Sequence, residues 1–450
     1  MLVLAFAVLC AAQVMLIVDV VVLTVALPTI QAALGIPAAQ LHLAGIAYTL
    51  TFGSLLIVAG RAGDLYGRRR VFRIGLLVFT IASALAALSQ EGWHLFAARV
   101  LQGAGAAMVS PTALALVTSL FKGDQRNRAL GIWASAGSAG AVLGQVLGGV
   151  LTDLINWQSI FLINLPIGIA GLLLAGRLPE EQSTGERQTL DIVGALLLAV
   201  GVAAFSVGLI GSPVSLLVAV AVLAVFWWHE RRQAEPLVRF GLLRLRAVQA
   251  GNGVLAALAG TTAAALFFAT LYLQDVTGYS ALQVGLAFAP ITVVVLVVSP
   301  YAGRLVGRVG ARPLMVGGAA IAATGLILLA FVSADGGYAT DVLPGLTLVA
   351  LGNGLAFAPT MIAATTVDAA DSGLASGLLN TAQELGSAAG LATLAPIAAA
   401  VATAAQPTDG YRAGYLAAAG VVLLATVLAV RTPSATGRTS PEPADVATEC

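Results

Sequence analysis

Long apolar stretches alternate with short polar ones along almost the whole chain. An apolar run of about 18 or more residues is long enough to cross a bilayer as a helix. Fourteen such runs occur, at 3–27, 41–60, 71–89, 95–120, 129–152, 158–176, 190–211, 213–229, 248–273, 283–302, 313–333, 342–366, 374–402 and 411–430. The pattern therefore predicts an all-α polytopic membrane protein with fourteen transmembrane helices.

The composition supports the membrane assignment. Only 10% of the residues are charged and 59% are hydrophobic, whereas a soluble globular chain has about 25% charged residues. The first apolar run has neither a basic flank nor a small-residue cleavage site, so we expect a transmembrane helix there and not a signal peptide.

The basic residues predict the orientation of the helices. The loops after the even-numbered helices, together with the C-terminal tail, hold 20 of the 22 lysines and arginines. Arg412 is the one basic residue in an opposite loop, and Arg99 is the one inside a predicted helix. Because cytoplasmic loops carry the excess of positive charge, both termini are expected in the cytoplasm. We interpret the basic loops as topology signals and not as a nucleic-acid site.

Several chemistries have no support in the sequence. The two cysteines, Cys10 and Cys450, do not suggest a disulfide framework, and the three histidines lack the spacing of metal ligands. The P-loop pattern GxxxxGK[ST] does not occur, so no ATPase function and no ATPase subunit is indicated. We expect no enzyme activity, no cofactor and no bound metal, and a proton is the only coupling ion considered.

An internal repeat divides the chain. GRAGDLYGRRR (60–70) follows the second predicted helix, and GRLVGRVGARP (303–313) follows the tenth; the repeat aligns Gly60 with Gly303, Arg61 with Arg304, Gly67 with Gly310 and Arg69 with Arg312. Two extra helices must then lie between two units of six. We predict a six-helix half at 1–180, a linker with two inserted helices at 181–240, a second six-helix half at 241–430 and a disordered cytoplasmic tail at 431–450. Repeated halves with a midplane site are typical of secondary transporters.

Several motifs together resemble those of a known family, the fourteen-helix drug:proton antiporters of the major facilitator superfamily. The 60–70 loop is similar to the superfamily's signature loop. Further similarities are DVVVLTVALP (19–28), RVLQGAGAA (99–107), WQSIFLINLPIG (157–168) and GLASGLLNTAQELGSAAG (373–390). The resemblance covers nearly the whole chain and implies the major facilitator fold and proton-driven drug or antibiotic efflux from a bacterial plasma membrane.

One motif departs from the family pattern. The fifth predicted helix reads GAVLGQVLGG (140–149), and Gln145 stands where the antiporter signature has proline. That proline is linked with antiporters as opposed to importers, so import or facilitated diffusion of a small solute remains an alternative. A non-transporting membrane receptor is a second alternative, although the loops and the tail are too short for a signalling domain.

Two ionisable residues within the predicted helices are expected to form a pair. At 1.5 Å per residue, Asp19 lies about 13 Å below the outer end of its helix and Arg99 about 9 Å below the outer end of its own. A charge at such depth usually faces the bundle interior beside a partner. Arg99 is therefore the natural partner of Asp19, and Gln102 shares its helix face.

Glu384 is predicted to behave differently from Asp19. It lies about 15 Å deep, near the midplane, and no basic residue inside a helix is left to pair with it. A buried carboxylate without a partner binds a proton more readily than one beside an arginine. We therefore hypothesise that Glu384 binds the proton or faces a cationic substrate, and that Asp19 titrates only if transport separates it from Arg99. The family resemblance instead favours Asp19 as the coupling residue, and a purely structural ion pair is a third possibility.

Other candidate site residues fall into three groups. The signature loop offers a cytoplasmic latch that breaks when the cavity opens inward, or alternatively a fixed topology anchor: Gly60, Asp64, Gly67, Arg68 and Arg69. Small residues on the fifth helix offer a smooth packing contact, either static or one about which the halves rock: Gly140, Gly144, Gly148 and Gly149. Polar residues inside the helices are candidates for lining a substrate cavity: Gln13, Gln102, Asn164, Asn353, Asn380 and Gln383.

The sequence thus predicts a secondary active transporter that exports amphipathic small molecules in exchange for protons by alternating access. The expected partners are a small-molecule substrate and the lipid bilayer.

Overall fold

The structure is a computed structural model of the chain. It describes residues 2–36, 43–176, 178, 191–209, 213–233, 236–238, 240–279, 281–333, 336–368, 371–402 and 407–430. The predictions for the tail at 431–450 and for most of the 177–190 linker therefore fall outside the described residues.

The first half of the chain forms α1 to α7 and the second half α11 to α16, with α8 and α9 between them in sequence. The first set is α1 (Leu2–Leu34), α2 (Leu43–Tyr66), α3 (Arg68–Ala87), α4 (Gly92–Leu120), α5 (Gly123–Leu154), α6 (Ser159–Leu162) and α7 (Asn164–Ala175). The inserted helices are α8 (Ile192–Leu209) and α9 (Pro213–Glu230). The last set is α10 (Phe240–Leu243), α11 (Arg246–Leu271), η2 (Tyr272–Val276), α12 (Ala281–Val309), α13 (Ala311–Leu329), η3 (Tyr338–Val342), α14 (Leu343–Ala364), α15 (Ser372–Val401) and α16 (Pro407–Val430).

The helices are long because a chain in lipid must satisfy its backbone hydrogen bonds internally. Within the described residues, thirteen helices are long and apolar enough to cross a membrane, and Ser159–Ala175 forms a shorter apolar segment. The predicted all-helical fold with about fourteen spans is thereby confirmed. That shorter segment is interrupted at Ile163, so Pro166 lies in the first turn of α7, where a missing backbone N–H removes no helical hydrogen bond.

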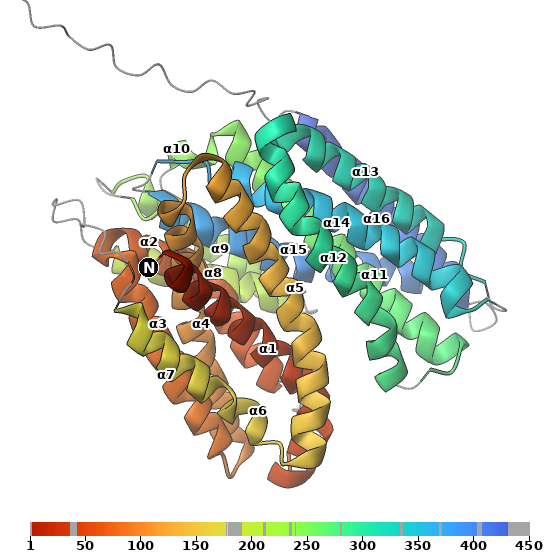
Figure 1. The fold of residues 1–450 in the computed structure, drawn as a ribbon, viewed down its shortest axis with the longest axis horizontal. Coiled ribbons are helices and arrows are strands. Elements are labelled where there is room, and N and C mark those ends of the chain that lie inside the picture. Colours follow the sequence, from red (N-terminus) through yellow and green to blue (C-terminus); the bar gives the residue numbers. More distant parts are fainter. Residues whose placement is uncertain are drawn as a thin grey trace, which may run out of the picture.

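The helices separate into two bundles. Helices α1–α7 gather on one side and α11–α16 on the other, while α8 and α9 lie at the back of the view in Figure 1. The inserted pair covers the line where the two bundles meet, because one apolar cluster contains Leu198 of α8, Ile57 of α2 and Leu374 of α15. The outward surfaces carry exposed leucine, isoleucine and valine side chains, as expected for surfaces in contact with lipid.

The predicted loop at 60–70 is shorter than the sequence suggested. Helix α2 continues to Tyr66 and α3 begins at Arg68, so Gly67 alone makes the reversal with φ of 93°. A positive φ of this size is accessible chiefly to glycine. Gly310, the aligned residue of the repeat, has φ of 84° between α12 and α13. Hydropathy had placed the helix end too early because the polar residues of the last turn belong to the helix.

We call the end of the bundle where Gly67 and Gly310 lie the arginine-rich end. Its arginines include Arg68, Arg69, Arg70, Arg304 and Arg308.

Candidate functional site

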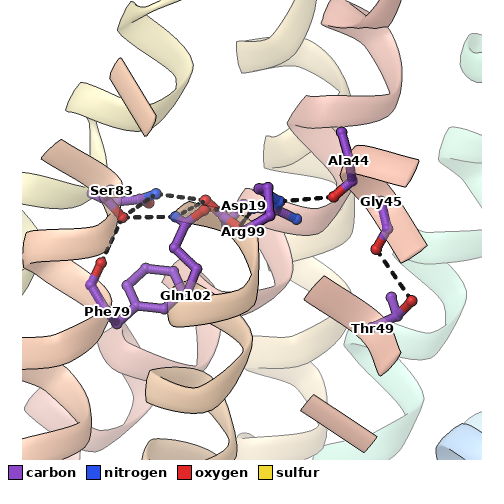
Figure 2. Close-up of polar contacts among 9 residues, drawn as sticks. Asp19, Ala44, Gly45, Thr49, Phe79, Ser83, Arg99 and Gln102 are labelled. Carbon is purple, nitrogen blue, oxygen red and sulfur yellow. Dashed lines mark hydrogen bonds and ion pairs between the residues drawn. The ribbon is translucent and has the colours of Figure 1, made fainter. Parts of the chain in front are cut away.

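A buried polar cluster surrounds Asp19, halfway along α1 (Figure 2). The Asp19 and Arg99 residues are 2% and 0% exposed. The Nη1 atom of Arg99 donates to Asp19 Oδ2. Gln102 Nε2 and Asn164 Nδ2 donate to Asp19 Oδ1 at 3.0 Å and 2.7 Å. One carboxylate thus joins α1 to α4 and α7.

A second layer of contacts holds the cluster in place. Gln102 Nε2 also donates to Ser83 Oγ at 2.8 Å, and that hydroxyl donates to the Phe79 carbonyl at 2.9 Å. Arg99 Nε donates to the Ala44 carbonyl at 3.2 Å, and the guanidinium lies 4.4 Å from the centre of the Tyr48 ring. Helices α2 and α3 are therefore tied to the same charge pair (Figure 2).

Every member of this cluster belongs to the first half of the chain. A rigid-body movement of one half against the other therefore leaves the distance between Asp19 and Arg99 unchanged. The structure brings the two charges together, as the depth argument anticipated, but it places them where movement between the halves does not part them.

A cavity of about 550 Å³ lies between the two halves. Apolar side chains from α1, α5, α11 and α14 make up much of its wall, and polar side chains are interspersed among them. Among the predicted cavity candidates, four line it: Gln13, Asn353, Asn380 and Gln383. Asn353 is oriented by its own contacts, because its Nδ2 donates to Thr262 Oγ1 at 2.9 Å.

Two of the predicted cavity residues do not reach the cavity. Gln102 and Asn164 are both 0% exposed, and their amides are directed at the Asp19 carboxylate. The physical reason is that a buried carboxylate needs several donors to replace the water it has lost. Depth alone did not distinguish a polar side chain that solvates a charge from one that lines a cavity.

Glu384 lies in the cavity wall, on α15, beside Gln383. Within the described part of the chain, it has neither a hydrogen-bond partner nor an ion-pair partner. Tyr48 lines the same cavity and also packs on Arg99. The tyrosine ring therefore lies between the enclosed Asp19 cluster and the space that Glu384 faces.

Asp64, in the last turn of α2, makes a polar contact between the two halves at the arginine-rich end. Its carboxylate accepts from the backbone amides of Gly373 and Leu374, both at 2.8 Å. These are the first amides of α15, which begins at Ser372, so the charge lies at the positive end of that helix dipole. Arg68 Nη2 donates to the same carboxylate at 2.8 Å. Asp64 thereby joins the two halves, and Arg68 is buried beside it and not directed at lipid.

A second charged contact between the halves was not predicted. Arg126 Nη2, in the first turn of α5, donates to the Thr365 carbonyl at 2.5 Å and to Thr365 Oγ1 at 3.0 Å. Thr365 directly follows the last residue of α14, so a positive charge lies at the negative end of that helix. The available signal was a basic residue in a helical first turn, where its own helix dipole disfavours it.

The remaining latch and packing residues have specific neighbours. Gly60 packs directly on the backbone of Gly373, across the two halves, and Gly131 of α5 packs on α12 in the same way. A Cβ atom added to Gly131 would lie 2.8 Å from the Ser299 carbonyl oxygen. Glycine permits this close approach of helices at both seams.

The predicted glycine stripe of α5 contacts a helix of its own half. Gly140 and Gly144 pack against α1, near Val14 and Val21, which is in the same half. Gly148 is buried further along α5, and the surroundings of Gly149 and Gln145 are not described. The stripe at Gly140 and Gly144 is therefore a contact within one half, because α1 and α5 are neighbours there.

Two repeat-related helical bundles, a largely apolar cavity between them with polar groups in its wall, and charged contacts that join the bundles at one end define the class of membrane transporters built from repeated halves. Comparisons with known proteins agree. Residues 9–391 match the model of the Major Facilitator Superfamily, and the chain belongs to this family.

Similar relatives include antibiotic export and resistance proteins. The chain is 37% identical to the cephamycin export protein of Amycolatopsis lactamdurans, over 94% of this chain and 90% of the relative. It is 35% identical to the puromycin resistance protein of Streptomyces alboniger, over 93% and 89%. A human organic anion transporter superimposes with a TM-score of 0.70 at 17% identity, covering 94% of this chain and 98% of that one, which supports the fold alone. The chain thus falls in the fourteen-helix drug-efflux branch of the superfamily.

Proposed function

We propose that the protein exports amphipathic small molecules across a bacterial plasma membrane in exchange for protons. The arginine-rich end faces the cytoplasm under this proposal, because cytoplasmic loops carry the excess of basic residues. The described structure then corresponds to a state closed toward the cytoplasm by Asp64 and Arg126. Entry of protons yields about 2.3 kcal/mol per charge per 100 mV, which drives export without ATP.

Glu384 is the proton-binding residue in this proposal. The observation that carries it is a carboxylate in the wall of the cavity without a partner among the described residues. Such a group can take up a proton from one side and release it to the other as the halves move. Asp19 is assigned a different role: with Arg99, Gln102 and Asn164 around it, its charge is held within one half, and it braces α1 against α4 and α7.

The experiment compares three variants in reconstituted vesicles with an imposed pH gradient. Glu384→Gln is expected to lose proton-driven accumulation and to retain substrate exchange without a gradient, whereas Glu384→Asp keeps part of the coupling. Full coupling in Glu384→Gln would refute this assignment. Asp19→Asn combined with Arg99→Gln is expected to retain coupling, since no proton passes through the pair.

The direction and substrates are tested in cells. Expression in a host that lacks its own efflux pumps is expected to raise resistance to puromycin or to a cephamycin, the compounds named for the relatives. Increased accumulation of a labelled compound would instead support the import alternative that Gln145 leaves open.

A further inference from the structure

A second pocket lies at the arginine-rich end, on the outside of the first half and away from the central cavity. Its volume is about 660 Å³, and it is formed by Tyr66 and Gly67 before α3, the first three turns of α3, and Leu172 of α7. Basic and apolar side chains share its wall: Arg69, Arg70, Arg73, Ile74 and Leu77. None of its lining residues lines the central cavity, although Arg68, which borders the pocket, bonds to Asp64 at the contact between the halves.

A hydrogen bond holds one side of the pocket in place, and the side chains that line it change from basic to apolar along α3. Arg69 Nη2 donates to the Gly176 carbonyl at 2.7 Å, which joins α3 to the end of α7. Arg70, Arg73 and Leu77 share one face of α3, because residues three and four apart are neighbours on a helix. The same face then continues away from the arginines, with Leu77 47% and Ile81 51% exposed. The wall is therefore basic at the end of the helix and apolar toward the middle of the bundle.

The internal repeat shows that the turn does not need these arginines. Gly310 makes the same reversal as Gly67, with φ of 84° against 93°. Yet Pro313 and Val316 occupy the positions that correspond to Arg70 and Arg73. Because the second turn forms without the two arginines, the geometry of the reversal does not account for their presence.

Arg70 and Arg73 also lack a protein partner. Within the described residues, neither makes an ion pair or a hydrogen bond through its side chain, although Arg68 and Arg69 next to them do. A signal for membrane orientation requires positive charge at this end, but it does not require two unpaired guanidinium groups in one pocket above an apolar helix face.

We propose that this pocket binds an anionic phospholipid. Its phosphate contacts the guanidinium groups of Arg70 and Arg73, which bind phosphate oxygens with two parallel hydrogen bonds. One acyl chain lies along Ile74, Leu77 and Leu172. Basic pockets between helices at the cytoplasmic surface suit such headgroups, and the apolar wall distinguishes a lipid from a free phosphate ion.

The test measures lipid binding to the purified full chain in phosphatidylcholine nanodiscs that contain a small fraction of phosphatidylglycerol, by native mass spectrometry. Arg70→Gln with Arg73→Gln is expected to weaken phosphatidylglycerol retention about thirtyfold, taking each arginine near an anionic surface at about fivefold. The matched control is Arg304→Gln with Arg308→Gln, which removes the same charge at the same end of the other half. This control is expected to change retention less than twofold.

Three outcomes overturn the proposal. Equal losses in the two double variants would mean that general surface charge attracts the lipid. Equal retention of phosphatidylglycerol and phosphatidylcholine by the wild type would exclude headgroup recognition. Displacement of the lipid by millimolar inorganic phosphate would assign the site to a free anion. Arg70→Lys with Arg73→Lys keeps the charge and the fold, and we expect it to retain part of the binding.

Discussion

Replacement of Asp19 by asparagine isolates the energetic role of the buried cluster. Asp19→Asn keeps the size of the side chain but leaves the Arg99 charge without a counter-charge at a position with no exposed surface. Removal of one partner of a buried ion pair costs about 3–5 kcal/mol. We expect the lower end of this range, about 3 kcal/mol, because the carbonyl oxygen of the introduced amide can still accept from Gln102 or Asn164.

A second substitution, at Arg99, removes the charge that Asp19→Asn leaves without a counter-charge. Asp19→Asn with Arg99→Gln places two neutral amides where the ion pair was, and we expect it to recover about 2 kcal/mol of the loss. The assay is the free energy of unfolding of the purified protein in detergent, followed by tryptophan fluorescence. Arg412→Gln is the control: its side chain is 52% exposed beside Asp409, and its loss is expected to cost below about 1 kcal/mol.

The reasoning is refuted if the losses in unfolding free energy from the two single substitutions add up to the loss in the double variant. Additivity would mean that Asp19 and Arg99 do not stabilise each other. The double variant also links stability to function. If it is stable and remains proton-coupled, the role of Asp19 is structural: it holds α1 against α4 and α7. If it is stable but uncoupled, Asp19 carries the proton, and the role proposed for Glu384 is wrong.

Three further predictions concern the closed end and the packing of helices. Asp64→Asn should weaken the closed state by about 1–2 kcal/mol, since it removes the charge at a helix N-terminus; a cysteine placed in the cavity should then react about tenfold faster with a thiol reagent supplied from the arginine-rich side. Arg126→Gln should increase the same labelling rate by a similar factor, and an unchanged rate would show that its contact does not hold the seam. Gly386→Ala should destabilise the second half by about 1–3 kcal/mol, because the new Cβ would lie 2.5 Å from Ala256 backbone atoms; Gly420→Ala, which meets nothing within 4 Å, is the matched control in the same unfolding assay.

Some features could be predicted from the sequence because they depend on local composition and on distance along one helix. Segments of about 18 apolar residues form helices in lipid whatever their neighbours are, since no other local structure satisfies the backbone. The rise per residue is constant, so the similar depths of Asp19 and Arg99 follow from counting. The repeat at Gly60 and Gly303 likewise predicted two corresponding turns, and each reverses at a glycine.

The partners of the polar residues were decided by tertiary structure. From the sequence, Gln102 and Asn353 are both candidates for lining a substrate cavity. Packing directs the first at a buried carboxylate and the second into the cavity. Packing also placed both members of the Asp19–Arg99 pair in one half, and it brought Arg126 to the end of α14. The physical reason is that a membrane helix offers several faces of similar apolarity, so its rotation and its neighbours depend on side-chain fit between helices distant in sequence. That fit determines which charge is enclosed and which faces the cavity.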